Sequence, residues 1–253
     1  IWFTTSRSGV ICFTADDRRP VCYHTTNSNI CSDKTTVVFE DKFGNIWIGS
    51  NDKGVTVFNP TNGAMTNHRH NASDPSSLSG NMVFSIVQAN DGTIYVASLD
   101  GGIDSYDYPS HRFRRNAIPV DCKTFVMRND PGQNAIYIGT EGDGMLLYDC
   151  VSGTVSRPDM HIDEFDATTA KVHDIMRDRR GNVWAALYQK GILMLSHDSN
   201  DFITYGFNPF DSSRDIGTAP VLAITKTTDG SLWIATDGDG IYKEDHAGDT
   251  TKF

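Results

Sequence analysis

Residues 46–58 read IWIGSNDKGVTVF, and five further segments of the chain repeat the same phrase. Each copy has an aromatic residue in an apolar run, then a polar turn, a glycine and a second apolar run. The other copies are residues 1–13 IWFTTSRSGVICF, 94–106 IYVASLDGGIDSY, 136–148 IYIGTEGDGMLLY, 183–195 VWAALYQKGILML and 232–242 LWIATDGDGIY. Their aromatic residues are Trp2, Trp47, Tyr95, Tyr137, Trp184 and Trp233, so the period is 42 to 49 residues. A period of this length, built from short strands, predicts an all-β propeller.

Each repeat predicts a four-stranded antiparallel blade. An almost wholly apolar stretch, such as residues 83–87, precedes the aromatic residue and suits a strand buried on both faces. A turn such as residues 43–45 or 132–134 joins this strand to the second, with glycine supplying the positive φ. The later glycine, for example Gly54, opens the third strand, and a weaker stretch such as residues 202–205 forms the fourth. The predicted blade units are approximately residues 1–30, 31–80, 81–120, 121–168, 169–215 and 216–253.

The two ends of the chain do not make a whole blade. The first copy begins at the second strand, at Ile1, and the last is followed by a short possible fourth strand at residues 250–253. The sequence therefore predicts about five complete blades and most of a sixth. Because an unpaired strand edge invites association with other chains, we expect the segment to belong to a larger array.

Composition narrows the range of partners. The chain has 253 residues and a net charge of −10, without long blocks of one sign. Phosphate binding requires a basic surface, so no nucleic-acid partner is expected. No run of 18 apolar residues and no targeting leader is present, so we expect no membrane-spanning segment within these residues.

The cysteines do not define a scaffold. There are five of them, an odd number, and their spacing fits no zinc site. Cys12 and Cys22 would lie on adjacent strands and could form a disulfide, or they could be small buried apolar residues. We expect no bound metal and no cofactor.

The repeat resembles the two-component regulator propeller repeat. That family combines a valine-rich strand, an acidic residue, a Gly-Asn turn, Trp-Ile-Gly-Thr, a polar turn, a glycine and an apolar strand. Residues 38–50 and 221–242 match this pattern best, and residues 71–81 resemble the family's Ser-Leu-Ser connection between blades. The resemblance extends over essentially the whole chain. It departs at Tyr95 and Tyr137, which replace tryptophan, and at residues 185–187, which replace Ile-Gly-Thr.

This resemblance implies a sensor. Proteins with these repeats are typically periplasmic input domains of bacterial hybrid two-component histidine kinases, and many respond to oligosaccharides. The implied role is an extracytoplasmic ligand-binding segment that is not itself an enzyme. The implied partner is a small molecule or oligosaccharide. Kinase activity, membrane attachment and homodimerisation would all come through the parent chain.

The expected ligand contacts lie in the loops between the second and third strands. These loops align with one another, yet their chemistry varies between similar strands, which is typical of recognition loops on a fixed scaffold. Their carboxylates, amide, cations and single aromatic ring suit a sugar, although polar turn residues are often only solvated. The candidate ligand-binding residues are Arg7, Asp52, Lys53, Asp100, Glu141, Asp143, Tyr188, Gln189, Lys190, Asp237 and Asp239.

Three other groups of residues carry weaker hypotheses. The repeated tryptophans could form a sugar platform, but their fixed position predicts packing between blades. Residues 237–240 resemble the start of a calcium loop without its closing glutamate, and residues 141–144 show that the acidic turn is a feature of the repeat. His68 and His70 could share a strand face, but no third metal ligand is apparent.

Two alternatives to a sensor remain. Streptogramin lyases have related repeats, and in them a histidine and acidic residues on the loops act with a metal ion. Here the aligned loops contain no histidine, and His173 falls within a first strand, where burial is expected. A purely structural interaction module is the third possibility.

Overall fold

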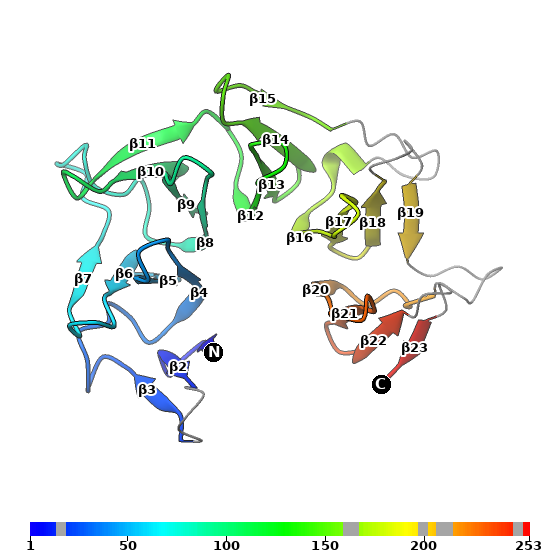
Figure 1. Cartoon of the computed structure of the whole chain (residues 1–253), viewed down its shortest axis with the longest axis horizontal. Coiled ribbons are helices and arrows are strands. Elements are labelled where there is room, and N and C mark those ends of the chain that lie inside the picture. The colour runs from blue at the N-terminus through cyan, green and yellow to red at the C-terminus, as the bar shows by residue number, and fades with distance from the viewer. Residues whose placement is uncertain (14–18, 159–166, 197–201, 206–214, 245–249) are drawn as a thin grey trace. The chain divides into compact units, whose positions relative to one another are not determined.

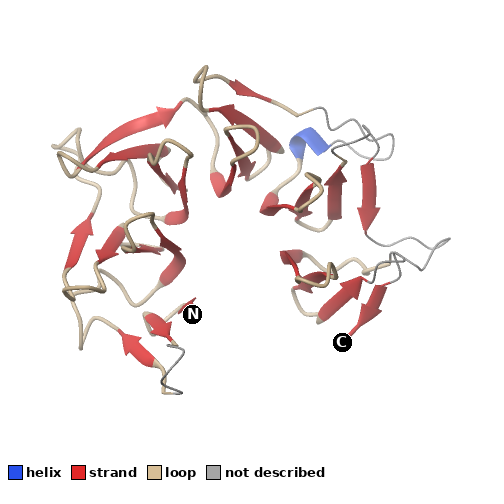
Figure 2. Ribbon diagram, in the orientation of Figure 1, coloured by secondary structure: helices blue, strands red, loops and turns tan. Residues whose placement is uncertain are grey.

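The computed structural model of the chain is built almost entirely of short β-strands (Figures 1 and 2). It describes residues 1–13, 19–158, 167–196, 202–205, 215–244 and 250–253. The strands are, sheet by sheet, β1 (Trp2–Thr4), β2 (Val10–Cys12) and β3 (Val21–Tyr23); β4 (Thr35–Glu40), β5 (Ile46–Ser50), β6 (Val55–Phe58) and β7 (Met65–His68); β8 (Val83–Gln88), β9 (Ile94–Ser98), β10 (Ile103–Asp107) and β11 (Arg112–Ile118); β12 (Thr124–Asp130), β13 (Ala135–Thr140), β14 (Met145–Asp149) and β15 (Val155–Ser156); β16 (Val172–Arg177), β17 (Val183–Leu187), β18 (Gly191–Leu195) and β19 (Phe202–Tyr205); β20 (Val221–Lys226), β21 (Leu232–Thr236), β22 (Ile241–Glu244) and β23 (Thr250–Lys252). A 3-10 turn, η1 (Ala167–Thr169), precedes β16.

These strands form six small sheets, and in each the strands are hydrogen-bonded in chain order. Five sheets have four strands, and the sheet of β1, β2 and β3 has three. The fold is therefore a six-bladed β-propeller, and the predicted fold class, with five complete blades and most of a sixth, is confirmed.

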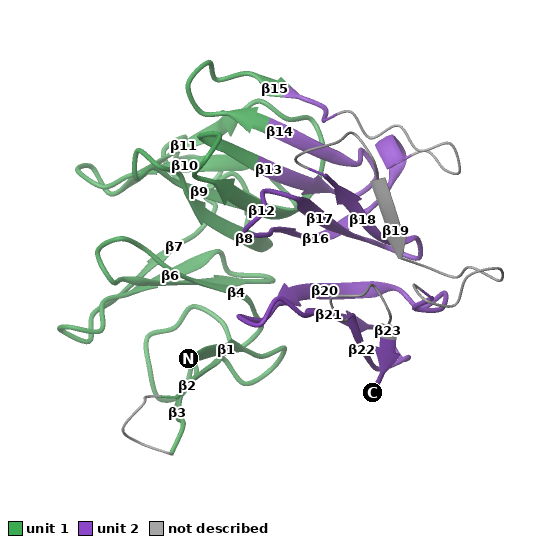
Figure 3. Cartoon of the chain, turned by 45° about the vertical axis from the view of Figure 1, so that its right-hand side comes forward, with its two compact units in different colours: residues 1–136, 148–155 green, residues 137–147, 156–253 purple. Residues whose placement is uncertain are grey.

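The chain divides into two compact units, which Figure 3 colours separately. Unit 1 comprises residues 1–136 and 148–155, and unit 2 comprises residues 137–147 and 156–253. In unit 1 the first strands β4, β8 and β12 pack alongside one another in that order. In unit 2 the first strands β16 and β20 do the same. Within each unit, neighbouring four-stranded blades thus meet mainly through their first strands.

The turn between the first and second strands follows the predicted chemistry in all but one blade. Gly44 has φ of 78°, a conformation that glycine adopts without steric cost. In the fourth blade the prediction that glycine supplies this conformation is wrong, because Asn134 has φ of 50° and Gly132 is not in the left-handed region. Asparagine tolerates that region better than most residues, so Asn134 supplies the positive φ in this turn.

Glycine is required before the third strand for a different reason, as Gly54 shows. At Gly54 an added Cβ atom would lie 2.2 Å from the carbonyl oxygen of His68, far inside van der Waals contact. The backbone there also has φ of 79°. Both the close approach of β7 and the backbone conformation therefore require glycine.

In the second and fifth blades the aromatic residue of the repeat packs toward the following blade. Trp47 is fully buried, and its ring meets that of Tyr106 edge-on at 4.9 Å between centroids. Trp184 is 5% exposed and lies in one cluster with Ile224 and Ile234 of the next blade. Their predicted role in packing is confirmed, since neither ring is accessible to a ligand.

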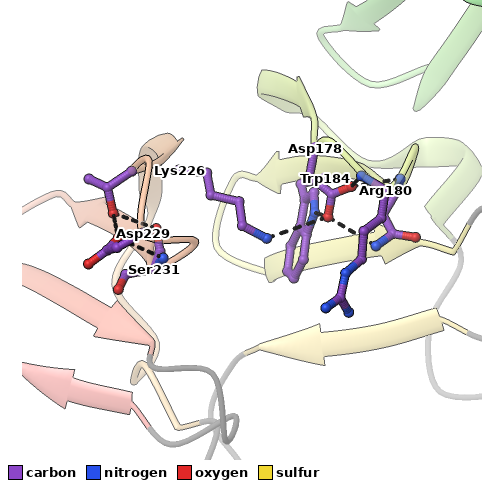
Figure 4. Close-up of polar contacts among 8 residues, drawn as sticks. Asp178, Arg180, Trp184, Lys226, Asp229 and Ser231 are labelled. Atoms are coloured by element: carbon purple, nitrogen blue, oxygen red, sulfur yellow. Dashed lines mark hydrogen bonds and ion pairs between the residues drawn. The ribbon is translucent and has the colours of Figure 1, made fainter.

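A buried carboxylate holds two of these indole rings. The Asp41 Oδ2 atom accepts a hydrogen bond of 2.9 Å from Trp47 Nε1, and Asp178 Oδ2 accepts one of 3.2 Å from Trp184 Nε1. Lys226 of the next blade also reaches Asp178, at 3.7 Å between Nζ and Oδ2 (Figure 4). The acidic residue of the repeat thus joins the turn, the indole ring and, at Asp178, the next blade.

The last blade keeps the tryptophan and lacks the acid. Thr227 occupies the position of Asp178, and the turn around it has the same backbone bonds, from Thr227 N to Ser231 O at 3.0 Å and from Gly230 N to Thr227 O at 2.9 Å. Within the part of the chain that the structure describes, Trp233 Nε1 is buried without a hydrogen-bond partner. A buried donor left without an acceptor lowers stability.

Thr227→Asp, made in an Asp229→Asn background so that no second carboxylate faces the new one, is therefore expected to raise the free energy of unfolding by about 1 to 2 kcal/mol, because it supplies the missing acceptor to Trp233. Urea denaturation followed by tryptophan fluorescence measures the change. Thr228→Asp is the matched control, since it adds the same charge at the adjacent exposed position. Equal effects of the two variants would show that charge, and not the indole bond, is responsible.

The two cysteines that could have formed a disulfide do not face each other. Cys12 pairs with Val21, whereas Cys22 pairs with Ile11. Neighbouring residues of a strand point to opposite faces, so the two thiols leave the sheet on opposite sides. Cys12 and Cys22 are therefore both free thiols.

Candidate functional site

A repeated backbone bond fixes the predicted recognition loops. In four blades the first residue after the second strand donates its N–H to the carbonyl of the residue just before the first strand. These bonds run from Asn51 to Lys34 at 2.9 Å, Leu99 to Met82 at 2.8 Å, Tyr188 to Lys171 at 2.9 Å and Asp237 to Pro220 at 2.8 Å. The recognition loop therefore lies beside the connection that enters the same blade. The side chains of the loop can contact that connection.

A hydroxyl at the end of the second strand shapes the loop itself. Ser50 Oγ donates to the Gly54 carbonyl at 2.9 Å and accepts from the Lys53 N–H at 2.9 Å. Thr140 makes the same two bonds, to the Gly144 carbonyl and from the Asp143 N–H, each at 2.8 Å. This explains the Ser or Thr that ends the second strand in most repeats, because its side chain replaces the hydrogen bonds that the turn interrupts.

In unit 1 the predicted acidic residues bind their own connections. Asp52 accepts a hydrogen bond from Ser32 at 2.7 Å and pairs with Lys34 at 3.1 Å. The Ser32 hydroxyl is the main cause that lowers the pKa of Asp52, with Lys34 adding to it against partial burial. Asp100 accepts the N–H groups of Met82 at 2.9 Å and Asn81 at 3.2 Å. These carboxylates hold the connections in place.

The cationic candidates of unit 1 lie differently. Arg7 and Lys53 are both exposed at the tips of their loops. The Lys53 charge lies close enough to Asp52 to help lower the pKa of that carboxyl. They remain predictions as ligand contacts.

In unit 2 two acidic candidates also have local partners. Asp239 accepts the Tyr242 hydroxyl at 2.6 Å and pairs with Lys252. The Lys252 and Tyr242 contacts lower the pKa of Asp239. Asp143 lies 3.9 Å from Arg157, while Asp237 is exposed. Each of these contacts stays within its own blade.

The strongest grouping in unit 2 surrounds Tyr188. The His173 ring stacks on the Tyr188 ring, with centroids 5.2 Å apart and planes at 25°. The Lys171 ammonium lies 5.9 Å from the Tyr188 centroid and 3.5 Å from Glu141 Oε1. We call Glu141, Lys171, His173 and Tyr188 the Tyr188 cluster. It combines an aromatic surface, a hydrogen-bond acceptor and a cationic donor.

The cluster corrects the sequence expectation for His173. That residue is in β16, as predicted, but it is only half-buried and lies against a recognition loop. Burial and the nearby Lys171 charge lower the pKa of His173, and Glu141 partly opposes them. The imidazole is therefore neutral around pH 7.

Sequence reasoning found Glu141 and Tyr188 but missed Lys171 and His173. The antiparallel register pairs Val172 with Leu187, which places Lys171 and Tyr188 side by side. A regular register counted back from the turn at Gly181 would pair Val172 with Tyr188, so the irregularity between Val172 and Asp174 hides this grouping from the sequence. The neighbouring candidates Gln189 and Lys190 are exposed, and Gln189 has φ of 56°.

The weaker metal hypothesis receives no geometric support. The His68 ring packs edge-on against Tyr106 and Phe113, whereas His70 Nδ1 bonds to the Leu78 carbonyl at 2.8 Å. Among the described residues no group of three or more His, Cys, Asp or Glu side chains could hold a metal ion. Within the same residues no helix is long and apolar enough to cross a membrane.

Comparison of the sequence with family models finds the two-component regulator propeller repeat at residues 29–52. These residues include the connection into the second blade, β4, β5 and the start of its recognition loop. A search of curated protein sequences gives no significant match.

Solved structures with the same fold are more numerous. The extracellular domain of a hybrid two-component system from B. thetaiotaomicron matches with a TM-score of 0.77 at 20% identity, over 100% of this chain and 33% of that one. The extracellular domain of a one-component system from the same organism matches at 0.75 and 15%, over 100% and 34%. A catalytically inactive virginiamycin B lyase from Staphylococcus aureus with quinupristin matches at 0.73 and 14%, over 100% and 79%.

The chain thus spans about a third of the length of the two extracellular domains that it resembles. At identities of this size the structural similarity shows a common fold alone. The match at residues 29–52 confirms the two-component regulator propeller repeat that the sequence predicted. The chain is a six-bladed β-propeller that carries the two-component regulator propeller repeat.

Proposed function

We propose that the chain is a ligand-sensing extracytoplasmic segment of a hybrid two-component signal-transduction protein. It binds an oligosaccharide and passes the signal to a histidine kinase outside these residues. The regulator repeat and the likeness to extracellular domains of such systems support this role. A homodimer, formed through the parent chain, is part of the same proposal.

The proposal rests on the contrast between a repeated backbone framework and loop tips whose residues vary. The same backbone bond anchors the loop in four blades, while the residues at the loop tips differ. A fixed frame with varied tips is suited to recognition, because the tips can change without disturbing the strands. Chemical catalysis would instead require several groups at one reacting atom.

Calorimetric titration of the chain with a panel of oligosaccharides tests the proposal directly. We expect at least one glycan to bind and to be recovered unchanged. In the full-length protein the same glycan is expected to alter kinase autophosphorylation. If no glycan in the panel binds, the proposed ligand class is wrong.

A lyase is the alternative that one observation favours. The Tyr188 cluster places a half-buried histidine beside Glu141, and a virginiamycin B lyase shares the fold. Incubation with a cyclic depsipeptide and magnesium, followed by mass spectrometry, separates the two functions. A sensor leaves the depsipeptide intact, whereas linearised product would establish the lyase.

Loop and turn residues are expected to differ in their effect on binding. Single alanine substitutions at Asp237 or Lys53 should weaken glycan binding by about ten-fold or less, since each hydroxyl contact contributes only about 0.5 to 1.5 kcal/mol. The turn variants Lys42→Ala, Asn90→Ala and Arg179→Ala should leave affinity unchanged. Calorimetric titration of all five variants measures the affinities. Losses of affinity confined to the turn variants would show that the binding site lies at the turns.

A further inference from the structure

We propose that the Tyr188 cluster is a subsite for one uncharged pyranose unit, with Glu141 and Lys171 binding two neighbouring hydroxyls of that ring. The inference rests on the oligosaccharide function proposed above and adds the place and the class of sugar. Two of its four residues, Lys171 and His173, were not among the candidates of the sequence.

The first requirement of such a subsite is a fixed aromatic surface. Tyr188 is 37% exposed, and His173 supports its ring from one side at 5.2 Å. The backbone bond from Tyr188 N to Lys171 O, at 2.9 Å, fixes the residue at the end of β17. The exposed part of the ring is therefore held ready for the apolar C–H face of a sugar, at little cost in side-chain entropy.

The second requirement is a paired acceptor and donor. Glu141 Oε1 and Lys171 Nζ lie 3.5 Å apart, and their side chains are 27% and 47% exposed. A carboxylate accepts hydrogen bonds and an ammonium group donates them, whereas a hydroxyl does both. Two adjacent ring hydroxyls can therefore bridge the pair, one donating to Glu141 and the other accepting from Lys171. Hydrogen bonds to charged groups are the stronger kind.

The charge of the cluster selects against acidic sugars. Glu141 already neutralises Lys171, and the His173 imidazole carries no charge at neutral pH. A uronate or sulfate placed at Lys171 would lie close to the Glu141 carboxylate and be repelled by it. The cluster therefore fits a sugar ring whose only polar groups are hydroxyls.

Isothermal titration of the chain with two sets of hexasaccharides tests the inference. The uncharged set is maltohexaose, cellohexaose and mannohexaose, and the charged set is hexagalacturonate and a heparin hexasaccharide. We expect the tightest ligand to be uncharged. Tyr188→Ala and Glu141→Gln should each weaken its binding by about ten-fold or more, and Tyr188→Phe, which keeps the ring, should weaken it less than Tyr188→Ala.

Phe43→Ala is the matched control. Phe43 is 63% exposed, and the Lys42 ammonium lies 5.2 Å from its ring centroid, so it reproduces a solvent-exposed cation–aromatic pair away from the recognition loops. Its loss should leave the affinity unchanged. Thermal melts of every variant identify a general loss of structure, and Glu141→Gln, which keeps the size of a partly exposed side chain, keeps the test valid if Tyr188→Ala fails to fold.

The outcomes distinguish a failure of this subsite from a failure of the proposed oligosaccharide function. Tightest binding by a charged hexasaccharide, or uncharged binding that survives both Tyr188→Ala and Glu141→Gln, overturns the subsite and leaves the oligosaccharide function standing. Equal losses in Phe43→Ala and Tyr188→Ala also overturn it. If neither set binds, the oligosaccharide function fails and the subsite fails with it.

Discussion

Replacing Trp47 with alanine is expected to lower the free energy of unfolding by about 3 to 5 kcal/mol, the cost of emptying a large buried aromatic site. Trp47 is fully buried in a cluster that also contains Leu78 and Ile94, and it meets the Tyr106 ring at 4.9 Å. The substitution would leave a cavity between two blades and remove the indole bond to Asp41. Urea denaturation followed by far-ultraviolet circular dichroism measures the loss.

Phe43→Ala is the control for this prediction as well. Phe43 is four residues away in the same blade but largely exposed, so its removal should change stability far less. The fraction of Trp47→Ala that remains folded should bind a glycan with unchanged affinity. A Trp47→Ala protein of normal stability that no longer binds would contradict the packing role and make the ring a ligand contact.

Asp41→Ala should have the second largest effect, with a loss of about 3 kcal/mol, since several buried donors would lose their acceptor together. Asp41 accepts hydrogen bonds from Trp47 Nε1 at 2.9 Å, from the Tyr108 hydroxyl at 2.8 Å and from two backbone N–H groups of its own turn. Asp41→Asn, which keeps the shape and one acceptor oxygen, should lose less. Chemical denaturation of the two variants beside the parent protein gives both values.

The same residue predicts a dependence on pH. Burial alone would raise the pKa of Asp41, but the bonds from Trp47, Asn45 and Tyr108 outweigh it and lower the pKa below the ordinary value near 3.9. A carboxyl group with a lowered pKa stabilises the fold above that ordinary value, and this stabilisation is lost as the pH falls through the lowered pKa. Stability should therefore drop more steeply below about pH 4 in the parent protein than in Asp41→Ala.

Asp229 provides a comparison for that experiment. It is an exposed turn carboxylate that accepts the Ser231 N–H at 3.1 Å, and the Thr227 hydroxyl is the main cause that lowers its pKa to about 2. Asp229→Ala should cost less than Asp41→Ala, because water can replace its contacts. Equal losses would mean that burial of the carboxylate contributes nothing.

Much of the fold was predictable because its signals are local and repeated. The glycine turns, the apolar first strands and the aromatic anchors recur with one period, so each copy supports the others. The positive φ at Asn134 rather than at Gly132 was not predictable, since both residues are common in turns. The positions of Cys12 and Cys22 depended on strand register, which composition does not specify.

The candidate site was predictable only in part. The loops follow from the repeat, and Tyr188 was found because it is the one aromatic residue in the aligned loops. His173 was assigned to burial because its place in a strand says nothing about which ring lies opposite. The stacking on Tyr188 arises from the pairing of β16 with β17, a contact between residues fifteen positions apart in the chain.

The bond that ties each recognition loop to its connection has a consequence for protein engineering. It joins a main-chain N–H to a main-chain carbonyl, so it places no demand on the side chains that it supports. Among the four blades with this bond, a loop triplet can then be exchanged as a cassette, for example the Asp237-Gly238-Asp239 triplet in place of the Asn51-Asp52-Lys53 triplet, which keeps the main-chain bond and removes the Asp52 contacts to Ser32 and Lys34. A propeller built in this way can acquire a new specificity one blade at a time, without a new scaffold for each ligand.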